Sequence, residues 1–154
     1  MANGLLKPIA LATLVAGTLD ILAAATLTLI YGRPVPGMLR AVASGPFPGA
    51  SGWGAGGAAL GLLVHFTLMA IMVTVFVMAA RRRPTLRYNP LKWGVLYGLV
   101  TYVVMNLIVV PLRFGGFPPS PESVATQLFC HIVLVGLPIA WITSRHFQTR
   151  QPAF

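Results

Sequence analysis

Four long apolar stretches, separated by short polar segments, dominate the pattern of the chain. They cover residues 9–30, 58–80, 93–112 and 124–143, and none of them contains Lys or Arg. Each is long enough to cross a bilayer as a helix, which takes about 20 residues. Backbone groups find no hydrogen-bonding partners in lipid, so the stretches must be helical. The pattern predicts an all-α integral membrane protein, a single domain over residues 1–154 that folds as a four-helix antiparallel bundle.

The connecting segments on the two sides of this bundle differ in character. Residues 31–57 form a long loop rich in Gly and Pro between the first two stretches. Within it, we expect residues 38–44 to form one or two helical turns at the membrane interface, and residues 45–57 to form a flexible loop or a lid. The short loop before the fourth stretch ends in Ser120, Pro121 and Glu122, the pattern of a helix start. Glu122 is therefore interpreted as a helix-start residue.

Composition excludes the soluble and disordered classes. Of the 154 residues, only 8% are charged, and the mean hydropathy is +0.81, whereas a soluble domain carries roughly a quarter charged residues. The net charge of +9 raises the possibility of a nucleic-acid partner, but the basic residues lie between apolar stretches, which is typical of membrane topology. We therefore expect no nucleic-acid partner. The single Cys130 allows no internal disulfide.

The distribution of Lys and Arg predicts the orientation. One side holds the larger set: Lys7, Arg81, Arg82, Arg83, Arg87, Lys92, Arg145 and Arg150. The other side holds Arg33, Arg40 and Arg113. The positive-inside rule then places both termini in the cytoplasm. The first stretch exceeds the length of a signal-peptide core, so we interpret it as an uncleaved helix.

Arg81, Arg82 and Arg83 form a basic run at the cytoplasmic end of the second stretch. Such a run can bind the headgroups of anionic membrane lipids. It can also act as a topology anchor alone, and we favour that interpretation.

Each stretch carries a strongly polar residue away from its ends: Asp20, His65, Asn106 and His131. On the rise of a helix, the last three lie about 10 Å below the outer boundary and Asp20 about 15 Å below it. Polar residues in a membrane are costly and usually face the bundle interior. The sequence therefore predicts one polar cluster in the outer leaflet.

Residues spaced four apart support this cluster, because they share a helix face. Small residues at that spacing allow close helix contacts. The lanes with their polar members are Ala12, Ala16, Asp20, Ala24 and Thr28; Gly57, Gly61 and His65; Gly94, Gly98, Tyr102 and Asn106; and Gln127 and His131. We expect each lane to face a neighbouring helix. The alternative to a functional cluster is that Tyr102 and Asn106 bond across helices for packing alone. Met69 and Met72 could be soft metal ligands or apolar side chains that fill space, and we favour the second interpretation. Pro138 is expected to bend the fourth helix.

Several short motifs in the last three stretches resemble a family of small uncharacterised bacterial membrane proteins. They are Gly61, His65 and Phe66; Tyr97-Gly98; Tyr102-Val103-Val104-Met105-Asn106; Pro111-Leu112; and His131 with Gly136-Leu137-Pro138-Ile139-Ala140. They are also distantly similar to YagU-type inner-membrane proteins. The resemblance implies four transmembrane helices in a bacterial inner membrane, and it brings no activity and no catalytic residues. Where YagU-type proteins place a His in the third span, this chain has Asn106, which argues against a three-His metal site.

Three functions remain open at this point. In the first, the cluster binds or conducts an ion, a proton or a small solute. Asp20 is then the titrating group, His65 and His131 are relay groups or ligands, and Asn106 orients them by hydrogen bonding. A transport pathway through the membrane would need a homo-oligomer. In the second, the chain is an accessory or assembly subunit of a larger membrane complex. In the third, His65 and His131 hold a metal or are the axial ligands of haem b. An enzyme is disfavoured, because no nucleophile triad, phosphate loop or paired carboxylate is present.

Overall fold

The computed structural model describes residues 3–115 and 119–149, so Arg150 lies outside the described residues. Every regular element in those residues is helical, and the prediction of an all-α protein is confirmed. Four helical segments are long and apolar enough to span a membrane. They are α1 (Asn3–Ile30), α3 (Gly54–Arg82), the run Pro90–Phe114 and the run Pro121–Gln148. The predicted stretches fall inside these four segments, each a few residues short at one or both ends.

The last two spanning segments are not regular throughout. The third consists of α5 (Pro90–Tyr102), a π-helical part η2 (Val103–Val109) and α6 (Val110–Phe114). The fourth consists of α7 (Pro121–Phe129), a π-helical part η3 (Cys130–Gly136) and α8 (Leu137–Gln148). Each π-helical part ends two residues before a proline, Pro111 or Pro138. A proline lacks an N–H and its ring crowds the carbonyl four residues earlier, so the wider π-helical turn relieves that crowding.

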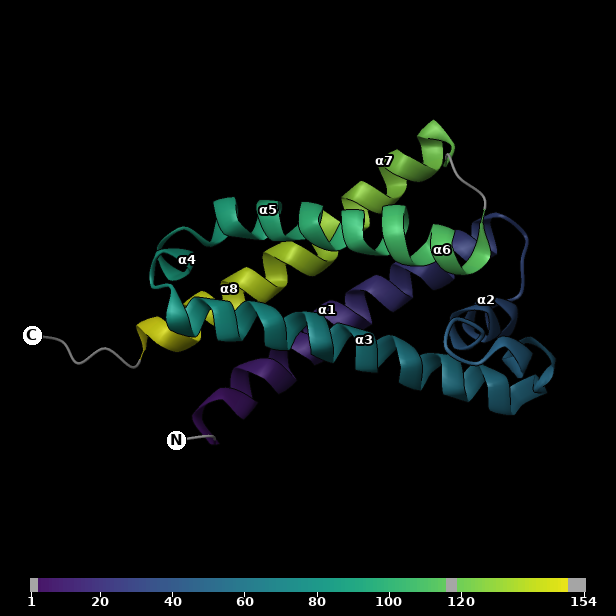
Figure 1. Ribbon diagram of the computed structural model, residues 1–154, viewed down its shortest axis with the longest axis horizontal. Helices are drawn as coiled ribbons and strands as arrows, with labels where there is room; N and C mark the ends of the chain where they lie inside the picture. The colour runs from purple at the N-terminus through teal and green to yellow at the C-terminus, as the bar shows by residue number, and fades with distance from the viewer. Residues whose placement is uncertain (1–2, 116–118, 150–154) are drawn as a thin grey trace, which may run out of the picture.

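Short elements join the spans. The segment α2 (Val35–Ala43) and the 3₁₀ turn η1 (Pro48–Gly52) follow α1, and α4 (Thr85–Tyr88) lies between α3 and α5. Gly32 ends the turn after α1, and Gly54 begins α3; both have positive φ, which glycine adopts without strain. Figure 1 shows α4 and the end of α8 at one end of the molecule, and α2 and α6 at the other.

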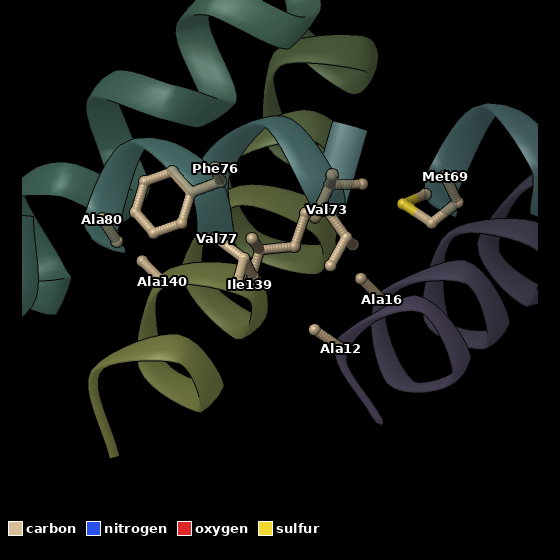
Figure 2. Close-up of a cluster of buried hydrophobic side chains, with 10 residues drawn as sticks. Ala12, Ala16, Met69, Val73, Phe76, Val77, Ala80, Ile139 and Ala140 are labelled. Atoms are coloured by element: carbon tan, nitrogen blue, oxygen red, sulfur yellow. The ribbon is translucent and has the colours of Figure 1, made fainter. Parts of the chain in front are cut away.

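The interior of the α4 end is a close-packed apolar core. Its members come from α1, α3, η3 and α8, and all but Val135 are labelled in Figure 2: Ala12, Ala16, Met69, Val73, Phe76, Val77, Ala80, Val135, Ile139 and Ala140. Lipid tails are as apolar as this core, so close van der Waals packing rather than the hydrophobic effect holds the helices together. At most 33% of any spanning window is buried inside the protein, which leaves most of each span for lipid.

The α2 end is held by backbone contacts of a different kind. A Cβ atom on Gly61 of α3 would collide with the backbone of Leu39 in α2, so the absence of a side chain lets α2 lie directly on α3. Arg113 of α6 then donates from Nε to the Gly45 carbonyl at 2.8 Å and from Nη2 to the Ser44 carbonyl at 2.8 Å. These bonds tie the third span to the end of α2.

This arrangement corrects one expectation. The lane of Gly57 and Gly61 does not face another spanning helix, because Gly57 meets the Ala50 carbonyl of η1 and Gly61 meets α2. The segment in close contact with this face of α3 is the connecting segment of α2 and η1, whose position cannot be predicted from the hydrophobic pattern alone. The expected start of the fourth span is confirmed, since the Ser120 hydroxyl accepts the Ser123 N–H at 3.2 Å and Pro121 begins the helix.

Candidate functional site

One cavity receives a polar side chain from every spanning segment. Its volume is about 410 Å³. Its polar lining residues are Asp20, His65, Asn106, Ser123, Gln127 and His131, and its apolar ones are Leu68, Met69, Met72, Met105, Val110 and Val135. The structure therefore brings together five of the six residues that the sequence singled out for the cluster. A ligand-binding role for them stays a prediction.

Asp20 and His65 form one wall of the cavity. The His65 ring bonds through Nε2 to the Gly17 carbonyl oxygen at 2.9 Å, and its Nδ1 lies 4.0 Å from Asp20 Oδ2. A carbonyl oxygen only accepts, so Nε2 must carry a proton. Nδ1 is then the ring nitrogen that faces the carboxyl group. The 4.0 Å between the two atoms is an ion-pair distance and is longer than a hydrogen bond.

Gly17 makes this geometry possible. The Phe66 ring lies against it, with Cε1 only 2.6 Å from where a Cβ would be. The same ring meets the His65 ring edge to face, at a centroid distance of 5.2 Å. A residue with a side chain at this position would displace Phe66, so the glycine brings α1 and α3 close enough for His65 to reach the α1 backbone.

His131 lies at the centre of a chain of hydrogen bonds. The Thr101 hydroxyl donates to the Gly98 carbonyl at 2.9 Å, so its oxygen must accept from His131 Nδ1, which is 3.2 Å away. With its proton on Nδ1, His131 accepts at Nε2 from the Asn106 amide nitrogen at 2.9 Å. The ring is buried and neutral, and every polar atom of it has a partner. His131 therefore orients Asn106, whose carbonyl oxygen is left for the cavity.

Close contact between the third and fourth spans sets these distances. A Cβ on Gly98 would lie 2.5 Å from both the His131 carbonyl oxygen and the Ile132 Cα. Gly136 in turn lies against the backbone of Gly94 and Gly98. Here the predicted small-residue lane does face a neighbouring helix, and it places His131 within reach of Asn106 and Thr101.

Tyr102 is the one predicted cluster residue that does not line the cavity. It is buried, and its ring meets the His131 ring edge to face at a centroid distance of 6.1 Å. Through this contact Tyr102 supports the His131 ring.

Thr101 and Ser123 belong to the site but were not singled out from the sequence. Ser123 continues the Gln127–His131 lane by four residues, which is a signal that sequence reasoning had available.

The donor set does not resemble a transition-metal site. Within the described residues, no group of three or more His, Cys, Asp or Glu side chains is placed to hold a metal ion. Both ring nitrogens of His131 are already hydrogen bonded, so haem ligation by His65 and His131 would require breaking the bond to Asn106. Cys130 is buried next to His131 and does not line the cavity.

The basic run at the other end of the molecule is exposed. Arg81, Arg82 and Arg83 have exposed side chains, and their contact with lipid headgroups stays a prediction. Arg87 is different, because its guanidinium donates to the carbonyls of Ala80 and Arg81, at 2.6 Å each, and caps the end of α3.

Comparison with known proteins adds no family. No protein family, curated protein or solved structure matches the chain. The similarity to YagU-type proteins therefore stays a prediction, and the functional argument depends on the geometry of the cavity.

Proposed function

We propose that this protein binds a small monovalent cation or a proton in the cavity, with Asp20 as the charged ligand. The observation that carries the proposal is the convergence of Asp20, His65, Asn106, Gln127 and His131 from four spanning segments on one cavity. A carboxyl group inside a membrane is costly unless it is protonated or neutralised by a partner. A proton and a cation therefore compete for Asp20.

The charge of the lining limits the ligand. Among the described residues, Asp20 is the only lining side chain that carries a formal negative charge, and no Lys or Arg lines the cavity. An anion would face an uncompensated carboxylate. A divalent cation would keep an excess positive charge in a medium of low dielectric constant. One carboxylate fits one positive charge.

The size and the apolar wall set the form of the ligand. A volume of about 410 Å³ has room for on the order of ten water molecules, each with a share of about 30 Å³. A bare ion would leave most of it unfilled, so the cation is bound with water or as a small organic amine. The flexible side chains of Met69, Met72 and Met105 give the organic part of such an amine an adaptable surface.

The remaining assignments follow from the sequence and are proposals as well. Both termini and α4 lie in the cytoplasm, because the larger set of basic residues is at that end. The cavity then belongs to the outer leaflet of a bacterial inner membrane. Among the described residues the polar lining of the cavity ends at the apolar core that contains Met69 and Val135, so we expect transport to require a conformational change or a homo-oligomer.

The test uses purified protein in liposomes. Movement of protons in response to K⁺, Na⁺ or methylammonium is followed with a pH-sensitive dye, for the wild type and for Asp20→Asn. The matched control is Thr67→Val, which removes a polar group from the exposed face of α3, where Thr67 bonds to the Leu63 carbonyl of its own helix. We expect Asp20→Asn to abolish the movement and Thr67→Val to retain it.

Binding without transport is measured separately. A ligand at a hundred times its Kd stabilises the folded state by about 2.7 kcal/mol, which thermal unfolding in detergent detects. The proposal is overturned if neither a monovalent cation nor a change of pH shifts the unfolding of the wild type, or if Asp20→Asn responds as the wild type does. The role of an accessory subunit of a larger complex would then be the better account.

A further inference from the structure

A second hollow lies next to the cavity, at the end of the molecule that carries α2. Its volume is about 590 Å³. It is lined by Ala24, Leu27, Thr28, Tyr31, Arg33, Met38, Ser120, Glu122, Ser123, Thr126 and Gln127. Most of these residues are polar or come from connecting segments, which is typical of a surface that water reaches. We call this hollow the vestibule.

The vestibule and the cavity share two lining residues, Ser123 and Gln127. Together with His131 these residues recur every four positions along the fourth span, so they follow one face. Their burial increases in the same order: Ser123 is exposed, Gln127 is half-buried and His131 is buried. The three side chains form a polar ladder from the vestibule down to the cavity.

The opposite end of the cavity is apolar. Met69 and Val135 line its inner end, and both belong to the close-packed core shown in Figure 2. Below them, Val73 and Ile139 are fully buried. No polar group continues the ladder in that direction among the lining residues, so water and ions meet apolar packing.

One side of the cavity is an apolar wall. Leu68, Met105 and Val110 line it, and the same three side chains line a groove of about 650 Å³ on their other face. Apart from Arg113 at its rim, the side chains of this groove are apolar. A hydrated cation would lose its water in crossing that wall, which is the costly step that the ladder avoids.

From these observations we infer that the ligand reaches Asp20 along the Ser123–Gln127 ladder, from the α2 end of the molecule alone, and that Gln127 forms the neck. This inference rests on the proposed function for the identity of the ligand. Arg33 and Glu122 give the vestibule both signs of charge, so it does not select for cations. Selection begins at the neck, where the amide oxygen of Gln127 replaces part of the water around a cation before the carboxylate is reached.

Cysteine labelling tests the route directly. The chain has one cysteine, so Cys130→Ala supplies a cysteine-free background. Ser123→Cys, Gln127→Cys and Asn106→Cys are each treated with a membrane-impermeant, positively charged methanethiosulfonate reagent. The exposed positions Ser51 and Thr85 mark the two sides of the membrane when changed to Cys in the same background. Val73→Cys is the control for the closed core.

We expect Ser123→Cys, Gln127→Cys and Asn106→Cys to react only from the side on which Ser51→Cys reacts, at rates that fall in that order. Val73→Cys should not react from either side. Reaction of Asn106→Cys from the Thr85 side would overturn the inference. The inference would also be overturned if Asn106→Cys reacted with a lipid-soluble maleimide but not with the charged reagent, because that would mean access through the apolar wall.

The role of the neck is tested in the same assay. With Asn106→Cys as reporter, Gln127→Leu should slow the reaction several-fold and Gln127→Ala should speed it, since one substitution removes the polar group and the other also removes the bulk. Equal rates in both would overturn the neck assignment. Labelling reports access and not binding. If the route holds while Asp20→Asn still binds K⁺, the proposed function fails and the route stands.

Discussion

Replacing Thr101 by Val tests the hydrogen-bonded chain that orients His131. Valine has nearly the same shape as threonine, but it has no hydroxyl. The change therefore removes the acceptor for His131 Nδ1, now at 3.2 Å, and the donor to the Gly98 carbonyl at 2.9 Å. The buried His131 N–H is left without a partner.

The size of the effect follows from this loss. A buried donor without an acceptor costs about 1–3 kcal/mol in soluble proteins. Bonds between helices in a membrane average about 0.6 kcal/mol and reach about 1.7. We therefore expect Thr101→Val to lower the free energy of unfolding by about 1–2 kcal/mol, a factor of roughly 5–30 in the folding equilibrium.

The assay is reversible unfolding in detergent micelles, with Thr67→Val as the matched control. The Thr67 hydroxyl bonds only to its own helix, at 2.8 Å from the Leu63 carbonyl, on the exposed face of α3. Its loss should change stability by less than about 0.5 kcal/mol. If the two variants are equally stable, the hydrogen-bonded chain does not orient His131 and the reasoning is refuted.

Two further substitutions test helix contacts, one beside the site and one at the α4 end of the molecule. Gly98→Ala should destabilise the protein by about 1–3 kcal/mol, because its Cβ would lie 2.5 Å from backbone atoms of His131 and Ile132. The control Gly56→Ala, which has open space around it, should be neutral or stabilising in the same unfolding assay. If Gly56→Ala were the more destabilising of the two, the close contact at Gly98 would be contradicted. Arg87→Lys should cost about 1–2 kcal/mol, because lysine cannot bond both carbonyls as the guanidinium does. The control is Arg83→Lys on an exposed side chain, and equal stability of the two lysine variants would contradict the capping role of Arg87.

The spans and the convergence of the polar residues are predictable from the sequence because both depend on helix geometry. The apolar pattern sets the four segments, and the rise per residue places His65, Asn106 and His131 at one depth. Spacing by four also identifies the Gly94–Gly98 lane, which contacts the fourth span as expected. These features depend on one helix at a time or on its depth in the membrane.

Features that depend on how a connecting segment folds back are not predictable in this way. The docking of α2 on Gly61 needs the path of residues 31–57, which no hydrophobic period encodes. The role of Thr101 needs the rotation of one span about another. Tyr102 is spaced four residues from Asn106, but its ring packs against the His131 ring and does not line the cavity.

The central claim, that Asp20 is the charged ligand of a cation, can be measured by infrared difference spectroscopy. The chain has only two acidic side chains, Asp20 and Glu122, so carboxyl bands can be assigned with two variants. Adding K⁺ or methylammonium to the purified protein should convert a protonated carboxyl band to a carboxylate band in the wild type and in Glu122→Gln, and not in Asp20→Asn. A spectrum without carboxyl bands in the wild type, or with the same bands in Asp20→Asn, would contradict the account.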